Sequence, residues 1–240
     1  KNSATTKYSF IGAGSQNLVS GNSYSTNYSA SVVVGGKQNK ALDGYNYSSS
    51  FVGGGNNNFA GSSYITFDSV VGGKSNTAIG GYSFIGGGKF NIASAISSSI
   101  VGGNSNRVTG ATSFVGGGTS NYSFGSSSAI VGGLLNKATA ALSFIGGGSG
   151  NSALTQSYAT IVGGKSNRVS GPRGFIGAGY SNIVASQSSV VSGGEYNTAS
   201  GYISFIGGGQ NNTVTGDNAT IAGGSSNRAS GNGSFIGAGN

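Results

Sequence analysis

Apolar and polar positions recur along this chain at a fixed spacing. One column always holds Ile or Val and runs from Ile11 to Ile236, with steps of 22, 19 and 18 residues followed by steps of 15 and a single 16. Glycines follow this column, an Asn lies three residues after the last Gly, and an Ala or Val usually comes two residues later, as in Ser83 to Ala93. This self-similarity predicts a repeat architecture of short stacked coils.

The residues on either side of the Ile/Val column share the opposite face of a strand, because side chains alternate along it. They are Phe84 and Gly86 in one coil and Ser99 and Val101 in the next, and this exchange continues along the chain, so the true repeat is two coils or about 30 residues. Alternating a ring with a smaller residue keeps the summed volume level and predicts packing against another copy. The candidate interface residues are Phe84, Phe114, Phe144, Phe175, Phe205, Phe235, Val101, Val131 and Val162.

A second column holds Asn in all fourteen complete copies, from Asn17 to Asn227. We expect these amides to stack as a ladder, bonding to one another or capping turn backbone. The Gly pair supplies a sharp turn that needs positive φ or the absence of Cβ. Small residues such as Ala93 face inward on a second short strand. The sequence therefore predicts an all-β protein, a parallel β-solenoid (β-roll) of about 15 short coils.

The irregular coils come first. We predict one repeat domain over 1–240, with an N-terminal lead-in at 1–8, coils with inserted loops at 9–69 and regular coils at 70–240. The insertions fall in the same connecting segment of successive coils, so we expect them to lie side by side on one flank. The candidate ligand-binding residues in them are Tyr24, Tyr28, Tyr45, Tyr47 and Tyr64. A role in capping the core is the alternative for such atypical terminal repeats.

Charge is sparse, with twelve Lys and Arg against four acids, and a net charge of +8. This balance favours an acidic partner such as a cell-surface glycan, although the low density of base disfavours nucleic acid and also suits a purely solubilising role. Basic residues follow the ladder Asn only on alternate coils. Such a basic stripe indicates either adhesion to an acidic polymer or a solvated edge that discourages lateral aggregation. Its members are Lys40, Arg107, Lys137, Arg168 and Arg228.

Residues for catalysis or metal binding are few. Asp43, Asp68, Glu195 and Asp217 are scattered, and the chain has no His or Cys, so nucleophile–base pairs and the usual zinc ligand sets are unavailable. The glycines lack the Asp of calcium-binding nonapeptides, and the strand–loop–helix context of a phosphate-binding loop is missing. We therefore expect no enzyme, cofactor or metal site. The apolar runs are too short to span a bilayer, and the first residue is not Met, so we expect a processed product or a piece of a longer chain.

The motif S-F-I-G-G-G followed by N-x-A-x-G, at fifteen-residue spacing, resembles the coils of YadA-like trimeric autotransporter adhesin heads. It is also similar to the IGGGxxN repeats of bacteriophage tail-fibre and other virion-fibre proteins. The resemblance extends from Ser9 to Asn240 and implies a left-handed parallel β-roll, a homotrimer around one axis, and an extracellular, cell-surface or virion location. The ladder Asn and the Phe of alternate coils are bulkier than the residues of the adhesin motif.

We expect a non-enzymatic fibrous protein that attaches to a cell surface or glycan through loops and stripes on a trimeric solenoid. A purely architectural, self-assembling filament or sheath component is the main alternative. An ice-binding solenoid is a further one, but it needs a regular Thr array, and Thr occurs irregularly here. Polysaccharide cleavage would need two acids on neighbouring coils.

Overall fold

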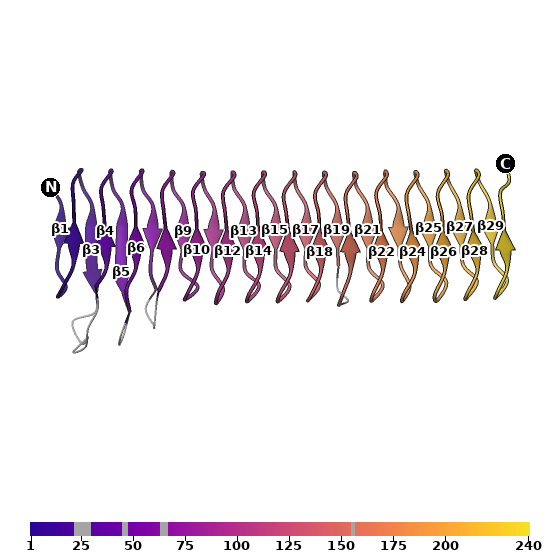
Figure 1. Ribbon diagram of the computed structural model, residues 1–240, viewed down its shortest axis with the longest axis horizontal. Coiled ribbons are helices and arrows are strands. Elements are labelled where there is room, and N and C mark those ends of the chain that lie inside the picture. Colours follow the sequence, from indigo (N-terminus) through magenta and orange to yellow (C-terminus); the bar gives the residue numbers. More distant parts are fainter. Residues whose placement is uncertain (22–29, 45–47, 63–66, 155–156) are drawn as a thin grey trace. The chain divides into compact units, whose positions relative to one another are not determined.

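A computed structural model describes residues 1–21, 30–44, 48–62, 67–154 and 157–240. These residues form a parallel β-solenoid of about 14–15 coils and contain no helix, which confirms the predicted fold class. The chain divides into two compact units, Lys1–Ser120 and Asn121–Asn240. Within each unit every coil adds one strand to each of two parallel sheets (Figure 1). The two-coil repeat and the trimer stay predictions.

In the first unit the odd-numbered strands form one sheet and the even-numbered strands the other, each in sequence order. The odd-numbered strands are β1 (Ser3–Ala4), β3 (Leu18–Gly21), β5 (Lys40–Asp43), β7 (Phe59–Ala60), β9 (Thr77–Ala78), β11 (Ile92–Ala93) and β13 (Arg107–Val108). The even-numbered strands are β2 (Phe10–Ile11), β4 (Val32–Val33), β6 (Phe51–Val52), β8 (Ser69–Val70), β10 (Phe84–Ile85), β12 (Ser99–Ile100) and β14 (Phe114–Val115).

The second unit repeats this arrangement. Its odd-numbered strands are β15 (Tyr122–Ser123), β17 (Lys137–Ala138), β19 (Ser152–Ala153), β21 (Arg168–Val169), β23 (Ile183–Val184), β25 (Thr198–Ala199), β27 (Thr213–Val214) and β29 (Arg228–Ala229). Its even-numbered strands are β16 (Ala129–Ile130), β18 (Phe144–Ile145), β20 (Thr160–Ile161), β22 (Phe175–Ile176), β24 (Val190–Val191), β26 (Phe205–Ile206), β28 (Thr220–Ile221) and β30 (Phe235–Ile236).

The interior is a thin layer between the two sheets. Ile85 and Ile100 of the even-numbered strands and Ala93 and Val108 of the odd-numbered strands are all fully buried. Each of these strands is two residues long and points one side chain inward and one outward. Aliphatic and small residues therefore fill the space between walls that lie close together, as the sequence predicts.

The Asn column forms the predicted ladder along one edge of this interior. Asn91 is fully buried, and its amide nitrogen donates to the carbonyls of Gly87 and Gly103, each at 3.0 Å. Its side-chain oxygen accepts from the backbone N–H of Asn106 in the next coil, also at 3.0 Å. The bonds therefore run from side chain to backbone, so each Asn closes its own Gly turn and ties it to the next coil.

A further ladder, which we did not predict from the sequence, lies in the turn between the Gly pair and the Asn. It consists of isolated parallel bridges, such as Lys74 to Lys89 and Lys89 to Asn104. The N–H of Lys89 donates to the carbonyl of Gly103 at 2.9 Å, and the N–H of Phe90 donates to the carbonyl of Lys74 at 2.9 Å. We call this the turn ladder. It holds the side chains of successive Gly–Asn turns in register.

Candidate functional site

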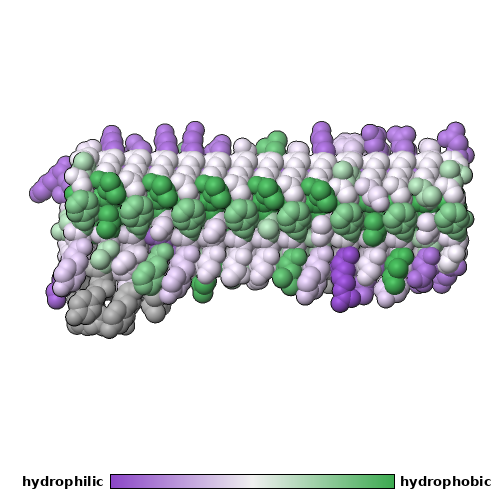
Figure 2. Space-filling view, in the orientation of Figure 1, coloured by the Kyte–Doolittle hydropathy of each residue, from purple (hydrophilic) through white to green (hydrophobic). Residues whose placement is uncertain are grey.

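The outward residues of the even-numbered strands, together with the residues that directly follow these strands, form what we call the Phe/Val face. Figure 2 shows apolar side chains gathered in such a band on each unit. In the first unit Phe84 is 39% exposed and Val101 is 54% exposed, and in the second unit Phe144 is 39% exposed and Val162 is 51% exposed. The other predicted interface residues are also exposed, or partly so at Phe175: Phe114, Val131, Phe175, Phe205 and Phe235.

A Gly stands two residues after each of these Phe residues. Its place has a steric reason in addition to compensating for the volume of the ring. A Cβ at Gly86 would lie 2.5 Å from the carbonyl oxygen of Val101 in the next coil and 3.5 Å from Cε1 of the Phe84 ring. A Cβ at Gly146 would likewise lie 2.4 Å from the carbonyl oxygen of Val162. The ring therefore leans over its own glycine, and the adjacent coil approaches that glycine closely.

The Phe/Val face leaves a substantial apolar area in water. The four Phe residues of this face in the first unit are Phe10, Phe51, Phe84 and Phe114. A Phe side chain has about 200 Å² of surface, so these four expose roughly 300 Å² before any Val is added. Monomeric soluble proteins rarely expose contiguous apolar patches larger than a few hundred Å². A surface of this kind can bury itself against a second apolar surface of matching shape.

The basic stripe lies on the other wall, on the outward positions of the odd-numbered strands. Arg107 pairs in register with Ile92, while Lys137 and Arg168 both pair with Ser152, so an uncharged residue separates the cations as predicted. Arg228 is exposed, as are the other three members just named. Lys40 is partly buried, and its Nζ lies 5.4 Å from the ring centroid of Phe59.

The turn ladder carries a second set of cations, which the sequence reasoning missed. Lys74 and Lys89 are direct neighbours in this ladder, and Lys37 is separated from Lys74 by Asn56. The signal in the sequence is the residue directly after the second Gly of each pair, a column that we did not follow. Like charges on neighbouring coils attract anions to this edge of the first unit.

In the second unit the same turns hold a cluster of rings and charges. The rings of Tyr180 and Tyr196 meet edge to face with centroids 5.1 Å apart, and Lys165 Nζ lies 5.7 Å from the Tyr180 centroid. A side-chain hydrogen bond between the two tyrosines lowers the pKa of Tyr180 and raises that of Tyr196. Glu195 follows Tyr180 in the turn ladder, so one base and one acid flank this aromatic pair.

The acids of the first unit are buried rather than displayed. Asp43 accepts a hydrogen bond from the Ser31 hydroxyl, and burial raises the pKa of its carboxyl although the Ser31 bond acts in the opposite direction. Asp68 accepts from the N–H of Gly81 at 2.9 Å and from the Ser83 hydroxyl at 2.6 Å. Within the described part of the chain, no three His, Cys, Asp or Glu residues gather in a way that could hold a metal ion.

The five predicted ligand-binding tyrosines lie outside the described residues, and the patch that they are predicted to form stays a prediction. They are Tyr24, Tyr28, Tyr45, Tyr47 and Tyr64.

Comparison with known proteins leaves the family open. No protein-family model matches this sequence, and no match is found among curated proteins. Over the described residues, no helix has the length and apolar character needed to cross a membrane. A functional assignment therefore depends on the two walls of the solenoid, one with a band of exposed Phe and Val and the other with cations spaced among polar and apolar residues.

Proposed function

We propose that this chain is a non-enzymatic fibre segment that self-associates through the Phe/Val face and attaches to an acidic surface. The observation that carries the proposal is the difference in exposed residues between the two walls of the solenoid. Apolar residues such as Phe84 and Val101 are exposed on the even-numbered strands, while the basic stripe lies on the odd-numbered strands. Burial of the first wall between copies leaves the second wall facing outward.

The assembly that we propose is a homotrimer with the three Phe/Val faces turned toward a common axis. Each face alternates a ring with a smaller residue from coil to coil, as Phe84 pairs in register with Ser99 and Ser99 with Phe114. Such a surface has a knob next to a hollow at every step, so the rings of one copy enter the hollows of another. At about 25 cal/mol per Å², a ring that buries about 80 Å² contributes roughly 2 kcal/mol.

Attachment would then use the outward wall of all three copies at once. Basic residues on alternate coils, each separated by an uncharged residue, suit a flexible polyanion such as an acidic glycan on a cell surface. Each contact is weak because it is exposed and screened by salt. Three copies held in one particle raise the effective concentration of the remaining contacts after the first one forms, so avidity supplies the strength.

One pair of variants tests assembly and attachment together. Replacing both Phe84 and Phe114 by Ser removes two rings, and the strands accept Ser because Ser99 holds the same column in the coil between them. The matched control is Phe90→Ser, because Phe90 is 46% exposed but lies in the Gly–Asn turn away from this face.

We expect the unmodified chain and the control to scatter light with a mass close to three times 23.3 kDa. The double variant should shift toward the mass of one chain and lose binding to immobilised acidic glycans through loss of avidity. A monomeric unmodified chain would refute the assembly. A trimer that binds no acidic surface but joins end to end into filaments would instead identify an architectural component.

A further inference from the structure

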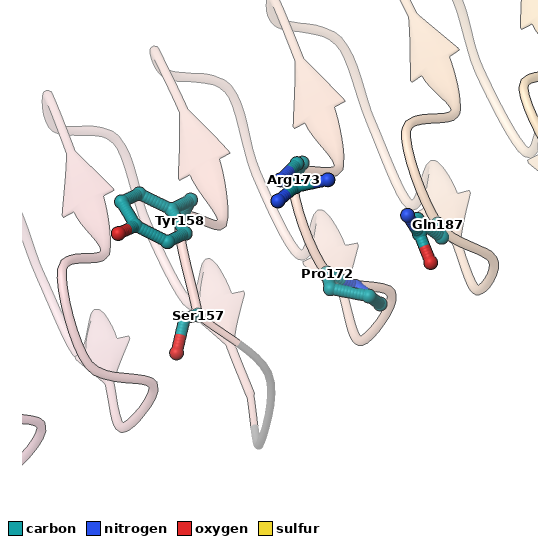
Figure 3. A pocket seen from close by; sticks show the side chains of 5 residues that line it. All are labelled: Ser157, Tyr158, Pro172, Arg173 and Gln187. Carbon is teal, nitrogen blue, oxygen red and sulfur yellow. The ribbon is translucent and has the colours of Figure 1, made fainter.

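The turns that lead from the odd-numbered to the even-numbered strands form an open surface pocket in the second unit, which we call the cavity. It measures about 270 Å³ and is lined by Ser157, Tyr158, Pro172, Arg173 and Gln187. These side chains come from the turns of three successive coils, between β19 and β20, β21 and β22, and β23 and β24 (Figure 3). We propose that this cavity binds one carboxylated pyranose, the acidic sugar unit of a glycan.

The backbone sets the spacing of the side chains that line the cavity. The N–H of Arg173 donates to the Ser157 carbonyl at 3.0 Å, and the N–H of Ser188 donates to the Pro172 carbonyl at 2.9 Å. Tyr158 and Arg173 occupy equivalent turn positions, both with positive φ, at 65° and 56°. The backbone positions that carry the ring and the guanidinium are thereby held one coil apart, about 4.8 Å, on turns braced by hydrogen bonds.

These residues depart from the repeat at one place. Pro172 is the only proline of the chain, and the coil that leads from Ile145 to Ile161 is the one with a 16-residue step. Among the described residues with positive φ at this turn position, Arg173 is the only charged one. The others are Tyr8, Tyr82, Ser97, Thr112, Ser127, Leu142, Tyr158, Ser188, Ile203, Asn218 and Gly233. The fold thus needs no Arg at this position, and the exposed side chain is available for a contact outside the coil.

The chemistry of the lining selects the ligand. Tyr158 is 54% exposed and offers a flat apolar face for the C–H side of a sugar ring. Arg173 presents a planar fork of donors that matches a carboxylate in a bidentate arrangement. Gln187 and Ser157 add donors and acceptors for ring hydroxyls. None of the five lining residues is acidic, so the cavity carries one net positive charge and favours an anion.

Size and composition argue against larger or more highly charged ligands. At about 270 Å³ the cavity falls just below the range of sites for drug-sized ligands, which suits one sugar unit rather than a nucleotide. A single Arg without a second cation in the lining suits the single charge of a carboxylate better than the double charge of a phosphate ester. The inference rests on the proposed attachment to acidic glycans and identifies one place where a sugar unit is held.

The test is saturation-transfer NMR and calorimetry on the full chain, with sialyllactose and trigalacturonate as carboxylated probes. Lactose serves as the neutral probe and glucose 6-phosphate as the phosphorylated one. The variants are Arg173→Gln and Tyr158→Ser, the latter tolerated by the turn because Ser188 has the same conformation. The matched control is Lys165→Gln, which removes an exposed cation of the same unit that belongs neither to the basic stripe nor to the cavity.

We expect a carboxylated probe to bind, with an affinity at least tenfold weaker in Arg173→Gln and Tyr158→Ser and within twofold of the unmodified chain in Lys165→Gln. Equal weakening by Lys165→Gln and Arg173→Gln would show diffuse charge attraction and overturn the site. So would equal binding of lactose or of glucose 6-phosphate, or no binding of either carboxylated probe. Light scattering in parallel separates this outcome from failure of the assembly, because the cavity variants leave the Phe/Val face intact.

Discussion

Replacing Asn91 by Ala should destabilise the first unit far more than its small loss of volume implies. The fully buried side chain donates to the carbonyls of Gly87 and Gly103 and accepts from the N–H of Asn106, all at 3.0 Å. Alanine removes all three bonds. It also leaves the buried N–H of Asn106 without its acceptor. The bond from the backbone N–H of residue 91 to the side-chain oxygen of Asn76 survives, because Ala keeps that N–H.

The magnitude follows from these contacts. Three hydrogen bonds at about 1 kcal/mol each give about 3 kcal/mol, and desolvation of the unpaired Asn106 N–H adds about 1–2 kcal/mol. We therefore expect the free energy of unfolding to fall by about 4 kcal/mol. In a solenoid each coil contacts only its neighbours, so the loss acts on the interfaces with both adjacent coils and cannot be shared along the chain.

The assay is urea denaturation followed by far-UV circular dichroism, with two comparison variants. Asn104→Ala makes the same substitution at an exposed position of the turn ladder and should change the unfolding free energy by less than about 0.5 kcal/mol. Asn91→Asp keeps the acceptor for Asn106 but cannot donate to two carbonyls and buries a charge, so it should be at least as harmful as Ala. If Asn91→Ala unfolds at the same urea concentration as Asn104→Ala, the ladder does not hold the coils together.

Two further predictions concern a glycine and a buried acid. Gly88→Ala should cost at least about 2 kcal/mol of unfolding free energy, because φ is +86° and a Cβ would lie 2.1 Å from the Gly103 carbonyl oxygen. Gly87→Ala, where a Cβ meets nothing within 4 Å and where Ala178 is the equivalent residue, should be neutral or stabilising; equal loss in both variants would contradict the steric argument. Burial raises the pKa of Asp43, so the native state holds this proton more tightly than the unfolded chain does, and the stability it contributes is lost as pH rises through the raised pKa. Asp43→Asn should therefore raise Tm at pH 7 and leave it nearly unchanged at pH 3 in calorimetry, and the opposite order would show that the charged form is the favoured one.

The periodic part of the fold was accessible from the sequence because the same physical demand recurs in every coil. A buried column admits only Ile or Val, as at Ile85, and a thin interior admits only small residues opposite it, as at Ala93. The Asn column is equally strict, since Asn is the shortest side chain that carries both an NH2 group for two donated bonds and a carbonyl oxygen to accept the third. Strict columns of this kind determine which residues lie inside and which strands stack.

The turn ladder escaped prediction because its residues satisfy no side-chain requirement. Its bonds are backbone bonds, so Lys89, Asn104, Thr119 and Tyr180 all serve, and the column shows no pattern. Positive φ at non-Gly positions was missed for the same reason. Phe90 adopts φ of 58° because its N–H is held by the Lys74 carbonyl of the preceding coil, which outweighs the side chain's own preference.

A residue that differs from the others in its column has a structural or an external role according to whether its polar atoms point into the coil or away from it. Asp68 stands in a column otherwise held mainly by Ser, such as Ser83 and Ser98, yet it is fully buried and one oxygen accepts three hydrogen bonds from Gly81 and Ser83. This oxygen is thus engaged by the next coil, and both oxygens are buried, so the role of Asp68 is internal.

Arg173 departs from its column in the opposite sense. Its backbone N–H serves the coil by bonding to Ser157, as every equivalent turn residue can do, while its side chain is exposed beside the Tyr158 ring. The long charged side chain therefore adds nothing that the repeat requires, and its exposed guanidinium is available to an external partner. In a repeat that is otherwise so uniform, this contrast with Asp68 is the reason to look for the ligand at the cavity first.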